Sequence, residues 1–431
     1  MPFQLRPRWP GTRGAGAAAQ TVALLALSAC SGTYPNSIFN AQTDFNRDAV
    51  GGLFNLIIWL GAAVFVFVEV LLVYTMWKYR SRPGQAEPKH VHGNTTLEIM
   101  WTAIPALILA WIAVPTVRTI FRTEATAPAS ALQIEVIGHQ WWWEFRYPEY
   151  KIVTANELYL PLGRTVNFAL KTNDVVHSFW IPSLAGKRDL IANRTNYLWF
   201  TPDSATQKAF NGVCVEFCGA SHANMRFRAF VVSPTEFASW AAYQATPGAV
   251  TLFKAPAAAA ARAGTKGTVA ARPAAPAGPV MMPSLTQAGY FFPADSMPAH
   301  IRPTTPLPAG LTFDDNLLAQ GDAARGADLI VNRMGGGCIG CHTIGGTIMT
   351  SVIGPNLTHV GSRNTIAAGL YPNDAKHLAL WIKNARLMKP GILMPTLGKG
   401  QIDPQIKQVP ATATLTDQQI ADIVAYLRAL K

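Results

Sequence analysis

The stretch CVEFCGASHANM, from Cys214 to Met225, brings two cysteines, a histidine and a methionine together. Thiolate, imidazole and thioether are soft ligands, and as a set they suit copper. A zinc site would not favour Met225, and a redox-active disulfide would need neither the histidine nor the methionine. A second imidazole stands upstream in NDVVHSFWIP. The pattern predicts a copper site rather than a structural disulfide, with these ligands: His177, Cys214, Cys218, His222 and Met225.

Short β-type runs surround this stretch. LQIEVI, TVNFALKT, NYLWF and FRAFVV lie within residues 131–235, and Pro, Gly and Asn turns separate them. Several short strands at this spacing indicate a sandwich or barrel. We therefore expect residues 130–245 to form a β domain that carries the copper site.

Two apolar runs precede the β domain. Residues 51–77 and 99–121 are each long enough to span a bilayer, which needs roughly 20 apolar residues. The loop between them is basic, so it is expected to be cytoplasmic, with both chain ends outside. Glu69 lies inside the first run and should face protein rather than lipid. Two spans cannot form a channel alone, so we expect a larger membrane partner.

The N-terminal residues 1–29 follow the order of a signal peptide, with basic, then apolar, then small residues. They end in LSA before a cysteine, and LSAC resembles the lipobox of bacterial lipoproteins. That resemblance implies cleavage before Cys30 and a lipid on its sulfur. The alternative is an ordinary signal peptide with an incidental cysteine. Residues 30–125 would then hold the N-terminal segment and the transmembrane hairpin.

A second cofactor motif lies near the C-terminus. CIGCH matches the C-x-x-C-H haem attachment pattern, in which Cys338 and Cys341 form thioethers and His342 binds the iron. A zinc site would need two more ligands. The sixth iron ligand has four candidates, of which Met394 is preferred, because ILMP resembles the distal loop of class I cytochromes c; the others are Met334, Met349 and Met388. A Met/His pair raises the potential, which suits an electron carrier.

The segment around this motif has a helical pattern and follows a biased linker. Residues 246–313 are expected to be the linker, because 246–280 are rich in Ala, Pro and Gly and lack the apolar residues of a core. Residues 281–312, which include GYFFP, could drape over a partner. From 314 to 431 the pattern is helical, and Thr416 and Gln419 match a capping box at the start of the last helix.

Several motifs together resemble known families. C-x-E-x-C-x-x-x-H-x-x-M, with HSFWIPSL, HGNTTLEIMWTAIP and GHQWWWEF, closely resembles subunit II of haem-copper cytochrome c oxidases over residues 40–240. Ala192–Asn193 stands where Pro-Gly is more usual, which leaves the ligands untouched. CIGCH, GPNL and ILMP resemble class I cytochromes c over about 318–431. The combination resembles subunit II of caa-type oxidases.

The resemblance implies a fold and a ligand arrangement. The expected protein is a multi-domain membrane protein with a two-helix transmembrane hairpin, a cupredoxin-like β-sandwich and an α-helical class I cytochrome c domain. Its copper site would be the binuclear CuA centre, with Cys214 and Cys218 bridging both metals. His177 and His222 would bind one copper each. The weak axial ligands would be Met225 and the carbonyl of Glu216.

The resemblance also assigns roles to residues outside the copper ligands. Trp141 would be the point of electron entry, while its two tryptophan neighbours pack. The Glu216 side chain would help bind Mg²⁺ at the contact with subunit I. Glu98 matches a capping box with Thr95 and would also lie at the mouth of a proton-uptake channel. The Pro355 carbonyl would receive the second N–H of the haem-ligating histidine.

The resulting expectation is the electron-entry subunit of a proton-pumping oxidase in a bacterial inner membrane, with its redox domains and both termini on the periplasmic side. Its partners would be subunits I and III, and its donor a cytochrome c or a quinol–cytochrome c reductase complex. Alternatives are the corresponding subunit of a CuA-containing nitric oxide reductase and, from another class, a copper carrier or assembly protein. The net charge of +12 comes without a basic run, which argues against nucleic-acid binding.

Overall fold

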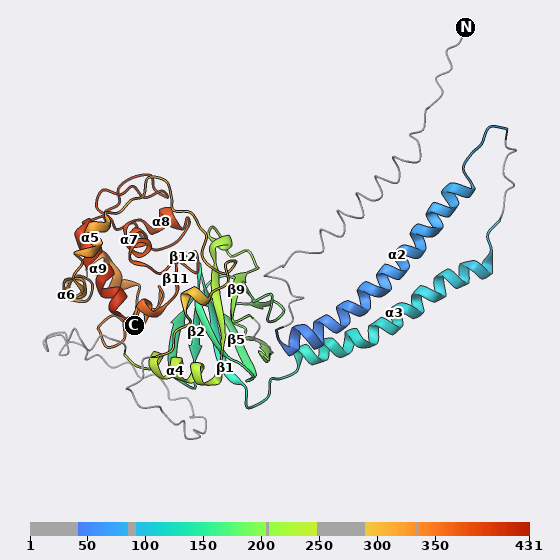
Figure 1. Cartoon of the computed structure of the whole chain (residues 1–431), viewed down its shortest axis with the longest axis horizontal. Coiled ribbons are helices and arrows are strands. Elements are labelled where there is room, and N and C mark those ends of the chain that lie inside the picture. Colours follow the sequence, from blue (N-terminus) through green and yellow to red (C-terminus); the bar gives the residue numbers. More distant parts are fainter. Residues whose placement is uncertain (1–41, 85–91, 204–206, 248–288, 333–334) are drawn as a thin grey trace, which may run out of the picture.

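The computed structural model describes residues 42–84, 92–203, 207–247, 289–332 and 335–431. The expected signal peptide, Cys30, most of the expected linker and Met334 lie outside the described residues. Figure 1 shows a long helical hairpin that projects from a β-sandwich, with a mainly helical C-terminal domain on the other side of the sandwich. The three parts occur in chain order.

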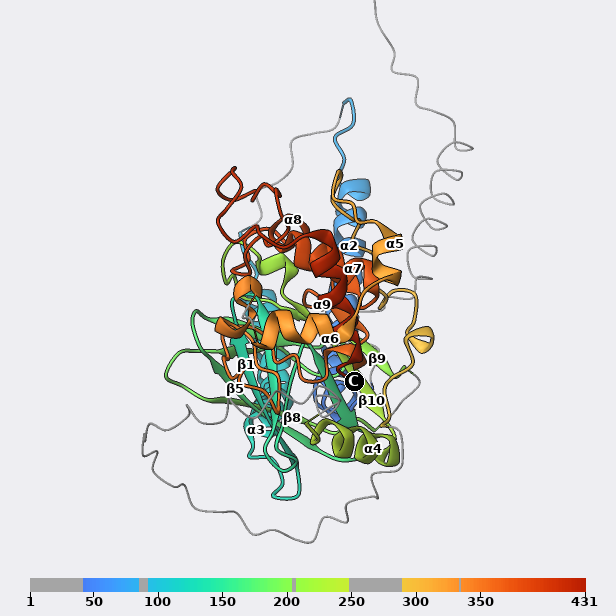
Figure 2. The ribbon, with the colours of Figure 1, turned by 90° about the vertical axis from the view of Figure 1, so that its left-hand side faces the viewer.

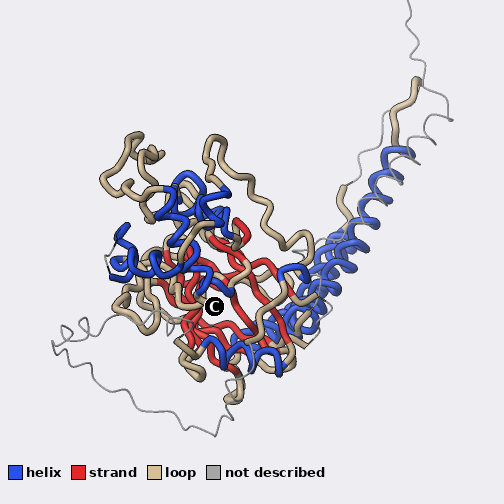
Figure 3. The backbone as a smooth tube through the Cα atoms, turned by 60° about the vertical axis from the view of Figure 1, so that its left-hand side comes forward, coloured by secondary structure: helices blue, strands red, loops and turns tan. Residues whose placement is uncertain are grey.

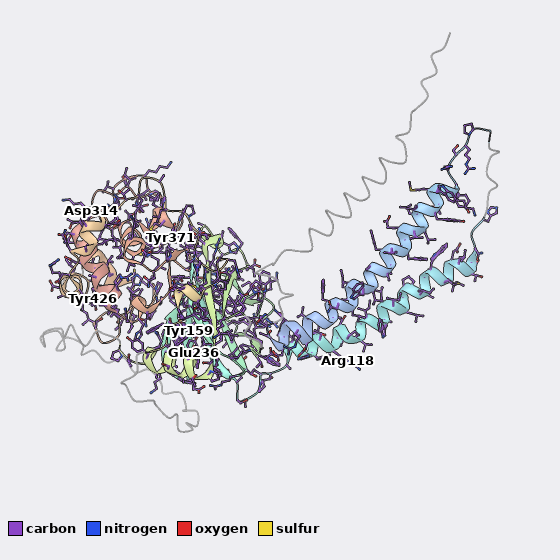
Figure 4. All side chains as sticks on the ribbon, viewed as in Figure 1. Arg118, Tyr159, Glu236, Asp314, Tyr371 and Tyr426 are labelled. Carbon is purple, nitrogen blue, oxygen red and sulfur yellow. The ribbon has the colours of Figure 1, made fainter. Side chains whose placement is uncertain are left out.

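The hairpin consists of α2 (Gly52–Lys78), which continues η1 (Phe45–Gly51), and α3 (Thr95–Glu124). Both helices are long and apolar enough to cross a membrane. Neither α2 nor α3 buries a side chain within this chain, and Figure 4 shows their side chains projecting freely. Such apolar surfaces must be covered by lipid or by partner subunits.

The start of α3 differs from the expectation. Its N-cap is Asn94, whose side chain accepts a hydrogen bond from the Leu97 N–H at 3.2 Å. Asparagine is among the best N-cap residues, and it precedes the threonine that was expected to cap. The predicted capping box of Thr95 and Glu98 is therefore wrong, and Glu98 lies one position too far into the helix for that role.

The sandwich contains two five-stranded sheets, ordered β3-β2-β1-β5-β8 and β4-β10-β9-β6-β7. Aromatic rings fill the space between them: Trp143 is fully buried and meets Phe179 and Phe227 edge-on. The strands are β1 Leu132–His139, β2 Trp142–Tyr147, β3 Ile152–Ala155, β4 Glu157–Pro161, β5 Val166–Thr172, β6 His177–Trp180, β7 Arg188–Leu190, β8 Asn196–Phe200, β9 Ala209–Cys214 and β10 Arg226–Val232. Helix α4 (Pro234–Gln244) follows, with a capping box between Ser233 and Glu236.

The C-terminal domain packs short helices around α9 (Asp417–Ala429). The capping box predicted for Thr416 and Gln419 is confirmed at its start. Figure 2 looks onto this domain, with α6, α7 and α9 in front of the sandwich. The other elements are α5 Asp315–Ala319, α6 Ala323–Ala327, η6 Asp328–Asn332, η7 Gly335–Gly340, η8 Val360–Ser362, β11 Thr365–Ile366, β12 Tyr371–Pro372, α7 Ala375–Lys383 and α8 Ala385–Met388.

The last part of the expected linker is packed against the sandwich. Residues 289–313, which we call the strap, contribute Phe292, Met297 and Ile301 to the sandwich core, where each is nearly or fully buried. The Phe292 ring stacks on Phe230 of β10 at a centroid distance of 4.6 Å. The strap differs from a free linker because its aromatic and aliphatic side chains have an apolar surface to cover. In Figure 3 the helices of the C-terminal domain lie directly beside the strands.

Candidate metal and haem sites

Residues 215–225, which we call the copper loop, connect β9 to β10. Cys214 is the last residue of β9, and Cys218 lies within the loop. The sulfurs of Cys214 and Cys218 lie 3.8 Å apart, whereas a disulfide bond is about 2.05 Å long. His177 Nδ1 lies 3.9 Å from Cys214 Sγ, and His222 Nδ1 lies 3.5 Å from Cys218 Sγ. The two thiols therefore sit side by side with one imidazole on each flank, an arrangement that fits two metals sharing two sulfurs.

Two weaker donors complete this set. Met225 Sδ lies 3.7 Å from the sulfur of Cys218, and the carbonyl oxygen of Glu216 lies 3.3 Å from that of Cys214. Met225 is fully buried, while the Glu216 side chain is exposed beside Phe217, an exposed aromatic residue. The backbone of Glu216 thus faces the metal site and its carboxylate faces outward.

Strand pairing positions these ligands. β6 begins at His177 and pairs with β9, so that Phe179 lies opposite Cys214. Asp174 Oδ1 lies 2.8 Å from His177 Nε2, which turns Nδ1 toward the sulfurs. A carboxylate behind a ligating histidine is a common device for orienting the ring. Sequence reasoning missed Asp174, although its position three residues before the histidine was a usable signal.

The two thiols titrate as a pair. The hydrogen bond between the two thiols lowers the pKa of Cys214 and raises that of Cys218. Burial lowers the pKa of His177, but its contacts with Asp174 and Cys214 more than offset this, so the net shift is upward. The site therefore favours one thiolate, the form that binds metal.

The C-terminal domain contains an apolar cavity of about 400 Å³. Cys338, Cys341 and His342 line it together with Met394. Of the described methionines, Met394 alone lines this cavity. Met349 and Met388 are buried in the surrounding core instead. The cavity thus brings the attachment motif and the preferred sixth ligand to one space.

The residues around the histidine fit a haem. His342 Nδ1 lies 2.8 Å from the Pro355 carbonyl oxygen, which leaves Nε2 for iron. A side chain at Gly354 would lie within 2.7 Å of the His342 ring, so only glycine lets the chain pass there. Burial lowers the pKa of His342, which keeps the imidazole neutral. The buried Nε of Arg363, which also lines the cavity, makes no hydrogen bond among the described residues.

The wall of this cavity is shared with the sandwich. Trp141 lines it from the β1–β2 turn, and Trp142 lines it from the start of β2. The Trp141 indole N–H donates to the carbonyl of Cys218 at 3.0 Å, and the Gln140 side chain donates to the same oxygen at 2.7 Å. Trp141 therefore touches the haem-type cavity on one side and the copper loop on the other.

Other predicted residues lie away from these sites. Glu98 lies exposed on the first turn of α3 and Glu69 lies on α2, both distant in sequence and element from the copper loop. Cys30 lies outside the described residues. The membrane hairpin, the soft-ligand site and the haem-type cavity together define a membrane-bound electron-transfer protein.

Comparisons with known proteins identify the family to which this membrane-bound electron-transfer protein belongs. Three family models match: "Cytochrome C oxidase subunit II, transmembrane domain" over 39–119, "Cytochrome C oxidase subunit II, periplasmic domain" over 152–232 and "Cytochrome c" over 323–431. The chain belongs to the cytochrome c oxidase subunit II family and carries a fused cytochrome c domain, which confirms the resemblance to caa-type subunits. It is a subunit of an oxidoreductase, a membrane protein with an extracellular domain.

Relatives support the same assignment over most of the chain. A cytochrome c oxidase subunit 2 of Alkalihalophilus pseudofirmus is 30% identical over 379 residues, covering 86% of this chain and 84% of the relative. That of Bacillus subtilis is 40% identical over 185 residues, covering 40% of this chain and 52% of the relative. The crystal structure of the periplasmic domain of subunit II of Bradyrhizobium japonicum cytochrome oxidase is 32% identical, with a TM-score of 0.25, and covers 27% of this chain and 94% of that one.

Proposed function

We propose that this subunit takes electrons from a donor at its cytochrome c domain and passes them through the copper loop to oxidase subunit I. Haem c and CuA would supply two one-electron carriers. Cys338, Cys341, His342 and Met394 would hold the first. The second would be held by His177, Cys214, Glu216, Cys218, His222 and Met225.

One observation carries this proposal: Trp141 joins the two sites. Its indole lines the cavity next to the attachment motif, and its N–H is bonded to the carbonyl of a copper-ligating cysteine. A short covalent and hydrogen-bonded route therefore runs from the cavity wall to the Cys218 sulfur. A copper carrier, the alternative from another class, would need neither the haem motif nor this connection.

The remaining assignments belong to the same proposal. The donor is a cytochrome c or a quinol–cytochrome c reductase complex, and subunit III is a further partner. The exposed Glu216 carboxylate would help to hold Mg²⁺ against subunit I, and Glu98 would collect protons for pumping. Both termini and both redox domains lie on the periplasmic side of the bacterial inner membrane, and Cys30 carries a lipid.

The test replaces Trp141 by leucine in the intact oxidase. Haem c is reduced by a light pulse, and the optical band of the copper centre is followed in a single turnover. We expect slower copper reduction with both optical spectra retained. Trp142→Leu is the matched control, because that indole lines the same cavity but is stacked on His139. An unchanged rate in the Trp141 variant would remove Trp141 from the route.

A further inference from the structure

A buried lysine joins the cytochrome domain to the electron-entry residue. Lys389 follows α8 and lines the haem-type cavity, and it is only 2% exposed. Its Nζ donates to the backbone carbonyl of Trp141 at 2.7 Å. Lysine is rarely buried without a counter-charge, and burial lowers the pKa of Lys389 to about 7. The partner of this ammonium group belongs to the sandwich, so the contact between the domains accounts for a lysine at this buried position.

Two further buried charges connect the same two domains from the sandwich side. Glu157 of β4 accepts hydrogen bonds from the backbone N–H groups of Asn364 and Thr365, both at 2.8 Å, and from the Thr365 hydroxyl at 3.0 Å. Arg228 of β10 donates to the Gly369 carbonyl at 2.8 Å and to the Ile301 carbonyl of the strap at 2.8 Å. Together with the Lys389 contact, these hydrogen bonds form only when the two domains are docked, so all three residues select this one position.

The backbones of the two domains approach each other closely at two glycines. A Cβ atom built at Gly391 would lie 2.8 Å from the Cβ of Ala220, inside the copper loop. One built at Gly369 would lie 2.7 Å from Arg228 Nη1. Both glycines have positive φ, so the backbone turns there and presents its atoms directly to the other domain. The hydrogen bonds and these close approaches select the same position.

We propose that Glu157, Arg228 and Lys389 form an interdomain lock that holds the cytochrome domain in one working position, with Lys389 as the positioning residue for Trp141. The inference rests on the electron relay proposed above. In the locked position Trp141 is 8% exposed and faces the domain's own cavity. A soluble electron carrier is therefore excluded from Trp141 and delivers its electron to the cytochrome domain. Electron transfer from the cytochrome domain to the copper site then does not require the domain to move into place first.

The test compares Lys389→Met with Lys399→Met in the full-length, cofactor-loaded oxidase. Lys399 belongs to the same domain and is exposed, so its variant removes the same charge without touching the interface. Hydrogen exchange is measured at the amides of Asn364 and Thr365, which are bonded to Glu157 and not to Lys389. Losing one buried hydrogen bond should raise the undocked fraction, and thus exchange at these amides, roughly tenfold. The Lys399 variant should exchange like the unmodified protein.

Two results would overturn the lock. One is unchanged exchange at both amides. The other is equal acceleration along α9, which would give Lys389 a role in the fold of its own domain. Glu157→Met removes the accepting oxygen and tests the lock from the sandwich side, with exposed Glu149→Met as its control, and here exchange is read at the β1–β2 turn around Trp141. It should accelerate only in the Glu157 variant, and no acceleration there would also refute the proposal.

Single-turnover kinetics separate this inference from the relay itself. In the unmodified oxidase, copper reduction after a light pulse on haem c should not depend on solvent viscosity. In Lys389→Met it should become slower and viscosity-dependent, because the domain must then find its position. Equal viscosity dependence in both proteins would refute the lock and keep the relay. Failure of any electron to pass from haem c to the copper centre in the unmodified oxidase would refute the relay.

Discussion

Removing the Phe292 ring should destabilise the sandwich domain although this residue lies outside its strands. The ring is 3% exposed, and the backbone N–H donates to the Tyr159 hydroxyl at 3.1 Å. Phe→Ala substitutions in cores cost about 3–5 kcal/mol. We expect about 3 kcal/mol, because the strap can partly close over the gap. With a urea dependence of about 1.5 kcal/mol per molar, the unfolding midpoint should fall by about 2 M.

The assay is urea unfolding of the soluble fragment that begins at Ser130, followed by the copper absorbance and by far-ultraviolet circular dichroism. Leu307→Ala is the control, since Leu307 lies in the same strap and is 37% exposed; its midpoint should stay within about 0.3 M. If Phe292→Ala lowered the midpoint no more than this control, the strap would be a passive connection and the packing argument would be refuted.

Further predictions concern the cofactors and single residues. The same fragment should hold two coppers and one covalent haem, and metal analysis with mass spectrometry would contradict the ligand sets if it returned one copper or no haem. Met225→Leu should keep both coppers but shift the potential of the centre; an unchanged potential in redox titration would make Met225 a core residue only. Glu98→Gln should leave assembly intact and lower turnover, and normal oxygen uptake would remove its proton role. Asp422 lies in α9, where burial raises its pKa but the hydrogen bonds from Arg325 outweigh this and lower it. Its stabilisation is therefore fully present above about pH 4 and declines as the pH falls through the lowered pKa. Asp422→Asn should cost about 1.5 kcal/mol at pH 7 and progressively less as the pH falls below 4; a loss that does not change with pH over this range would refute the charge argument.

Sequence reasoning could go furthest where the chemistry is local. The copper loop and the haem motif are short patterns of unusual residues, and His177 could be added because a β-rich segment delivers it to the same end of the sandwich. The start of α3 was misplaced by one residue because Asn94 and Thr95 are both good caps, and only the backbone decides between them. Asp174 could have been found, since a carboxylate three residues before a ligand is a readable signal.

The docking of the two domains could not be predicted from the sequence. Glu157, Arg228 and Lys389 are single charged residues far apart in the chain, and each looks like an ordinary surface residue until the other domain is in place. Their burial depends on contact between two surfaces that are far apart in the chain, and no periodic pattern in the sequence indicates such a contact. The strap could be predicted in part. GYFFP contains more aromatic residues than an Ala/Pro-rich linker needs, and such residues are typical of a segment that packs on an apolar surface.

The shared cavity wall also sets an order for biogenesis. Cys338 and Cys341 face a space closed on one side by Trp141 of the other domain. Cys218 is 2% exposed, in the loop that touches Gly391. An enzyme that attaches haem must reach the thiols of Cys338 and Cys341. A chaperone that inserts copper must reach the thiols of Cys214 and Cys218. We therefore expect the copper to be inserted before the two domains close, because the thiols of Cys214 and Cys218 are buried in the docked arrangement whereas Cys338 and Cys341 stay partly exposed.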